Sequence, residues 1–107
     1  MIKSDFFTSP SGSLYGFSIN GHANAGEVGH DIVCAAVSSA AYMVENTISE
    51  VMHVQADICV HENGFMKVLI SEKDISRSQD ILQGLKLHLL SLEEQYPKNI
   101  IVNYLEV

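Results

Sequence analysis

Residues 31–51, DIVCAAVSSAAYMVENTISEV, decide how this chain folds. Apolar side chains recur along this stretch at spacings of three and four residues, which is the period of one face of a helix. The stretch therefore predicts a helix of about five turns that buries one face against another element. The apolar stripe consists of Val33, Ala36, Val37, Ala40, Val44, Ile48 and Val51.

One pair of strands is predicted before this helix and a second pair after it. In the first pair, apolar residues alternate with small or polar ones, as in a half-buried strand. SPSG joins the first pair, and HENG, with its Asn63-Gly64 turn signal, joins the second. The predicted strands are Met1–Phe7, Leu14–Asn20, Gln55–Val60 and Phe65–Ile70.

A second amphipathic helix is predicted over Ser78–Gln95, before Pro97, and a last strand over Ile100–Leu105. The element order is therefore ββαββαβ. We expect an α+β fold with two layers, in which two helices pack on one face of a mostly antiparallel sheet. No linker or low-complexity tract divides the chain, so residues 1–107 are expected to form a single domain.

The composition favours a folded, acidic protein. The chain has 107 residues, of which 47% are hydrophobic and 18% charged, and its formal net charge is −7. Nucleic acid is bound through clustered lysines and arginines, and only six are present. We therefore expect no direct binding to nucleic acid, and a basic partner suits this charge.

The two cysteines, Cys34 and Cys59, do not form a disulfide framework. The first ten residues, MIKSDFFTSP, lack the apolar segment of a signal peptide, and no stretch approaches the ~20 apolar residues of a membrane span. The sequence therefore predicts a cytoplasmic protein with reduced thiols and no membrane association.

Reactive side chains gather around the glycine-containing loop Gly21–Gly29 and the helix that follows it. With Asp31 as the N-cap, Cys34 lies in the first helical turn, where the helix macrodipole favours a negative group. The Asp31 carboxylate opposes this effect, so a thiolate at Cys34 needs a cationic partner. His22 and His30 are the nearest imidazoles in the sequence.

A structural interpretation of the same residues is also open. A single cysteine in an apolar helix is commonly a small buried hydrophobe, and we expect this for Cys59, which lies between Ile58 and Val60. His30 can serve as a turn or cap residue, and the glycines can serve a tight turn. Spacing alone does not decide between a thiol–imidazole site and a turn.

A family resemblance bears on this choice. Gly21-His22-Ala23, a glycine-containing loop, and GHDIVCAAVS at residues 29–38 closely resemble the signature of the ribosomal-processing cysteine protease family, Prp. The last sixteen residues, LEEQYPKNIIVNYLEV, resemble the C-terminus of that family. Val28 departs from the family, in which an aromatic residue is frequent in the loop.

The resemblance implies a cysteine endopeptidase without metal or cofactor. It implies that His22 and Cys34 form a catalytic dyad, with Asp31 and Ser38 in support. Gly21 and Gly29 bracket the loop, which we expect to act as a lid over the substrate. The implied substrate is the short N-terminal extension of a large-subunit ribosomal protein, whose apolar, aromatic segment precedes lysines. The family resemblance also implies a homodimer.

Two rival functions use the same residues. A zinc site could combine His30 and Cys34 with His22 and Asp31, although the sequence has no CxxC or HxxxH pair. A non-catalytic ribosome-assembly module could instead use the loop to hold a basic protein tail. A pure binding module does not need both Cys34 and His22, which favours the protease.

Overall fold

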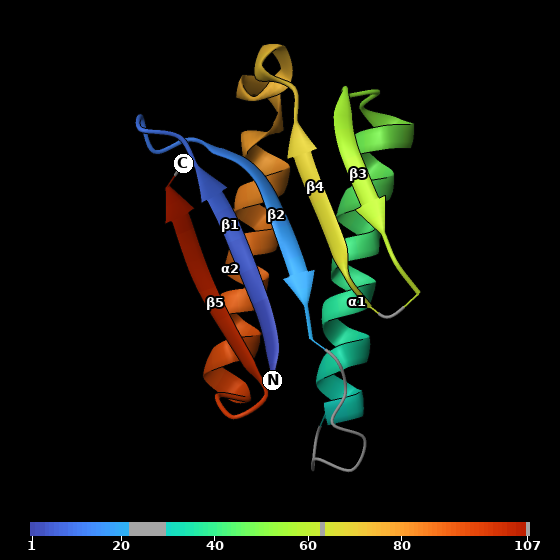
Figure 1. The fold of residues 1–107 in the computed structure, drawn as a ribbon, viewed down its shortest axis with the longest axis vertical. Coiled ribbons are helices and arrows are strands. Elements are labelled where there is room, and N and C mark those ends of the chain that lie inside the picture. Colours follow the sequence, from blue (N-terminus) through green and yellow to red (C-terminus); the bar gives the residue numbers. More distant parts are fainter. Residues whose placement is uncertain (22–29, 63, 107) are drawn as a thin grey trace.

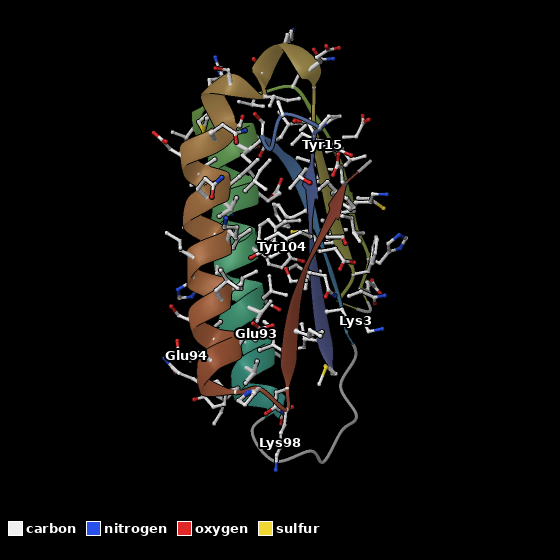
Figure 2. All side chains as sticks on the ribbon, turned by 90° about the vertical axis from the view of Figure 1, so that its left-hand side faces the viewer. Lys3, Tyr15, Glu93, Glu94, Lys98 and Tyr104 are labelled. Carbon is white, nitrogen blue, oxygen red and sulfur yellow. The ribbon has the colours of Figure 1, made fainter. Side chains whose placement is uncertain are left out.

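The computed structural model describes residues 1–21, 30–62 and 64–106, and only the backbone of His30. These residues form two layers, a β-sheet and a pair of helices that cover one of its faces (Figures 1 and 2). The strands are β1 (Ile2–Thr8), β2 (Leu14–Asn20), β3 (Ala56–Val60), β4 (Met66–Ile70) and β5 (Ile100–Glu106), and the helices are α1 (His30–Asn46) and α2 (Gln79–Gln95).

The described strands form one five-stranded sheet in the order β3-β4-β2-β1-β5. The pairings β1–β2, β2–β4 and β3–β4 are antiparallel, and β1–β5 is parallel. Both the mostly antiparallel sheet and the order ββαββαβ agree with the prediction. The short 3₁₀ turns Glu72–Asp74 and Ser76–Ser78 lead into α2, which begins one residue later than expected.

The core lies between the sheet and the helices. Val33, Val37 and Ile48 of the predicted stripe are buried, and they belong to the same apolar cluster as Phe6 and Phe17. The prediction was wrong for Val51, which is 72% exposed. Residues Thr47–Val51 form a π-helical turn, in which the Met52 N–H donates to the Thr47 carbonyl. The wider turn rotates the end of the helix, so Val51 leaves the buried face.

By length and composition alone, one helical stretch of the described residues could cross a membrane, and it is Asp31–Val51. In this fold the stripe on that stretch packs into the core, with Val33, Val37 and Val44 nearly inaccessible to solvent. A core helix of a two-layer protein meets the same test of length and composition.

The prediction that Cys59 is buried was also wrong, because Cys59 is exposed. Alternate residues of a strand point to opposite faces. Ile58 pairs with Val68, which is buried under the helices, whereas Cys59 pairs with Lys67 and faces the side that carries no helix. β3 is also the edge of the sheet, so even Ile58 is partly exposed.

Candidate active site

The helix that carries Cys34 begins at His30, two residues earlier than the Ile32 start that an Asp31 N-cap requires. Asp31 is therefore not the N-cap but the second helical residue, and it is exposed. As the second helical residue, Asp31 carries an exposed carboxylate that acts on the helix through its charge. In the first turn this negative charge stabilises the helix through the macrodipole.

Cys34 is the fifth residue of α1 and is partly buried. Its side chain packs against the edge of the apolar core. Side chains on a helix lean toward its N-terminus, so the thiol leans toward the first turn. The first backbone N–H groups of a helix have no acceptor within the helix. Cys34 is thus a partly accessible thiol whose side chain leans toward the first turn of α1.

Ser38 lies one turn after Cys34 on the same face of α1 and is partly buried. It borders a small cavity of about 30 Å³ between α1 and the ends of β2 and β4. The lining of this cavity is mainly apolar and consists of Ile19, Ser38, Ala41, Tyr42, Gly64, Phe65 and Met66.

Gly21 follows the last residue of β2 and has a backbone that only glycine adopts easily, with φ at +153°. A Cβ atom at this position would lie 2.5 Å from the Cα of Ile2 and 2.9 Å from the carbonyl oxygen of Met1. The chain therefore leaves the sheet pressed against the start of β1. This close approach fixes the point from which the next segment, starting with His22, departs.

Several predicted features lie outside the described residues. These are His22, Gly29 and the lid expected between Gly21 and Gly29, so the separation of the His22 and Cys34 side chains is not described. Among the residues that are described, no three His, Cys, Asp or Glu side chains come together as a metal site.

Sequence reasoning missed the aromatic residues of the cavity. Tyr42 lies eight residues after Cys34 and four after Ser38, so helical spacing alone could have placed it on this side of α1. Phe65 could not have been found in this way, because it reaches Ser38 and Tyr42 only through the pairing of β4 with β2.

The family model for the cysteine protease Prp matches residues 1–101. This chain belongs to the Prp family of cysteine proteases. It is 33% identical to the ribosomal processing cysteine protease Prp of Staphylococcus aureus over 105 residues, which cover 97% of this chain and 99% of that protein. The match includes the whole fold and not only the motif around Cys34.

Two solved structures of the Staphylococcus aureus protease agree with this fold. The complex with a substrate peptide matches with a TM-score of 0.89 and 31% identity, covering 98% of this chain and all of the other. The complex with a covalently linked product peptide matches with a TM-score of 0.85 and 33% identity, over 98% and 100% of the two chains. Family membership and these matches support a cysteine protease of ribosomal processing.

Proposed function

We propose that this protein is a cytoplasmic endopeptidase that removes the short N-terminal extension of a large-subunit ribosomal protein. The observation that carries the proposal is the position of Cys34, a partly accessible thiol near the start of α1 in the Prp fold. A thiol so placed can attack a peptide bond while amide donors of the first turn lie within the same region.

In the proposed mechanism Cys34 and His22 act as a dyad. His22 takes the Cys34 proton as the sulfur attacks the scissile carbonyl carbon, and later gives a proton to the leaving amine. A backbone N–H of the first turn of α1 would stabilise the negative oxygen of the tetrahedral intermediate, a contribution of about 3 kcal/mol per donor. Gly21 fixes the start of the segment that carries His22, and Gly29 ends it.

The charges of the chain suit the proposed substrate. The formal net charge is −7, and Asp31 places an exposed carboxylate in the first turn of α1, three residues before Cys34. Lysines that follow the cleavage site would be attracted to this charge. The apolar and aromatic residues on the other side of the bond would lie along α1, where Ser38, Tyr42 and Phe65 line the small cavity.

We also propose that the protein is a homodimer that associates through its helical layer. A groove of about 590 Å³ lies between α1 and α2, with a mainly apolar lining that includes Ala40, Met43, Gly84 and Leu85. Met43 is 56% exposed although it is apolar. A Cβ atom at Gly84 would meet no described atom within 4 Å, so the small residue is not needed for packing within its own chain. The space at Gly84 could instead admit a helix of a second copy.

The test is cleavage of a peptide with the order apolar–aromatic–aromatic–small–small–Lys–Lys, followed by mass spectrometry. The unaltered protein is expected to cut once before the lysines, and Cys34→Ser and His22→Ala are each expected to abolish the cut. Asp31→Asn and Ser38→Ala, which alter only supporting groups, should retain measurable cleavage. Tight peptide binding without cleavage by any protein would instead identify a non-catalytic module that holds a basic tail.

A further inference from the structure

A second thiol–imidazole pair lies on β3, apart from Cys34. The Sγ atom of Cys59 is 3.2 Å from the Nε2 atom of His61. The two residues are two positions apart on an extended segment, so their side chains share one face of the sheet. Both are exposed. A nucleophile within hydrogen-bond distance of a base is the arrangement that activates a thiol for attack.

The turn after β3 holds the imidazole in place. The His61 ring packs against the Phe65 ring, with their centroids 5.6 Å apart. The His61 N–H donates to the Phe65 carbonyl at 2.9 Å, and the His61 carbonyl accepts from the Gly64 N–H at 3.1 Å. These contacts hold the backbone of His61 and set its ring against Phe65, with Nε2 at hydrogen-bond distance from the sulfur.

The sulfur is open to solvent. Cys59 faces the side of the sheet that carries no helix, at the edge strand. Its cross-strand partner is Lys67, whose ammonium group lies 5.5 Å from the centre of the Phe7 ring and therefore extends across the sheet toward β1. A small molecule can thus approach Cys59 without displacing a described side chain that packs over it.

We propose that the Cys59–His61 pair is a thiol-modification site that exchanges with small disulfides. His61 Nε2 takes the proton from Cys59 Sγ as that sulfur attacks one sulfur of the disulfide R–S–S–R. A Cys59–S–S–R bond forms, the original S–S bond breaks, and the leaving R–S⁻ takes up a proton to give R–SH. Cys59 is oxidised and the released half of the disulfide is reduced, so no further reactant is needed.

This site is independent of the proposed protease chemistry. Cys34 lies on α1, in the helical layer, whereas Cys59 faces away from that layer. Because the chain has two cysteines, Cys34→Ser leaves Cys59 as the sole thiol and lets its reaction be followed by itself. The result of the cleavage assay therefore neither supports nor contradicts this proposal.

The test measures how fast folded Cys34→Ser protein forms a mixed disulfide with oxidised glutathione, by intact mass and peptide mapping. A free peptide of residues 55–66 is the reference, because it contains the same thiol and imidazole without the fold. We expect the folded protein to react about tenfold faster than this peptide, as a positioned base provides at least that much. His61→Gln in the same background should lose this advantage.

His88→Gln in the Cys34→Ser background is the matched control, because His88 is an exposed histidine on α2. It should leave the rate unchanged. The proposal is overturned if folded Cys59 reacts no faster than the peptide, or if His61→Gln retains the full rate. The comparison with the peptide remains decisive even if the His61 variant folds poorly.

Discussion

The side-chain amide of Gln79 binds both backbone groups of Leu14. The Leu14 N–H donates to Gln79 Oε1 at 2.9 Å, and Gln79 Nε2 donates to the Leu14 carbonyl at 2.5 Å. Leu14 begins β2 and Gln79 begins α2, and the strand register between β1 and β2 shifts beside this point, between Phe7 and Thr8. The side chain thus satisfies backbone groups where the ladder is irregular.

Gln79→Ala should therefore lower the free energy of unfolding by about 2 kcal/mol, because two partly buried backbone groups lose their partner. Urea denaturation followed by circular dichroism measures the change. Gln79→Glu keeps an acceptor for the Leu14 N–H but sets a charged oxygen against the Leu14 carbonyl, so it should also be less stable than the parent protein. Equal stability of all three proteins would contradict the role of this contact.

Ser4 offers a change in the opposite direction. Its hydroxyl is fully buried. Of the buried side-chain nitrogen and oxygen atoms in the described residues, the Ser4 Oγ atom is the one without a hydrogen-bond partner. Ser4→Ala removes an unsatisfied polar group and should raise the free energy of unfolding by about 1 kcal/mol. Ser4→Thr, which keeps the hydroxyl and adds a methyl group to a filled site, should be less stable than the parent.

Gly21→Ala should reduce both stability and cleavage. The added Cβ would lie 2.5 Å from the Ile2 Cα, so the end of β2 must shift and carry the segment with His22 along. Gly12→Ala is the control, because Gly12 also has a positive φ but a Cβ there meets nothing within 4 Å. Both variants share the backbone strain of about 1 kcal/mol. A greater loss of the cleavage rate in Gly21→Ala than in Gly12→Ala is the expected result.

Tyr104 should titrate above the usual pKa of a tyrosine. Its partial burial, and then the nearby charge of Glu93, raise the pKa of this half-exposed phenol above its usual value of 10. Tyr104 on β5 and Glu93 on α2 lie on facing elements (Figure 2). Between the two pKa values the phenol keeps its proton in the folded protein and loses it in the unfolded chain. The contribution of Tyr104 to the free energy of unfolding is therefore complete below the ordinary pKa, and it is lost as the pH rises through the raised pKa of the folded state.

Ultraviolet absorbance at alkaline pH measures this titration. Tyr104→Phe should remove the component with the raised pKa, and it should weaken the loss of stability above about pH 10. Glu93→Gln should bring the titration part of the way back, since it removes the charge but not the burial. The variant keeps an oxygen for the Val102 N–H, which donates to Glu93 Oε2 at 2.7 Å. An unchanged titration in Tyr104→Phe would show that another tyrosine is responsible.

Met43→Glu should separate the proposed dimer into monomers, because it places a charge in the apolar groove between α1 and α2. Light scattering after size exclusion measures the molar mass. Leu105→Glu, an equivalent change at an exposed apolar residue of β5, should leave the dimer intact. Identical masses for both variants and the parent would exclude the groove as the interface.

The sequence predicted the elements and their order because their signals are local. The spacing of Val33, Val37 and Val44 indicates one helix face whatever surrounds it, and the turn residues separate the strands. The prediction failed where a residue's environment depends on distant parts of the chain. Whether a residue of β3 is covered depends on which side the helices take, and the interpretation of Cys59 as buried rested only on its apolar neighbours Ile58 and Val60.

The sequence by itself determined the family and the fold class, and it supplies the two residues proposed for the dyad, since these follow from a motif and from short-range periodicity. Tertiary structure decided what the motif does not contain. It moved Asp31 from the cap into the helix, brought Phe65 beside Ser38 and Tyr42, and exposed Cys59 next to a restrained His61. Burial and pairing arise from contacts between segments that are far apart in the chain, so local sequence patterns do not encode them.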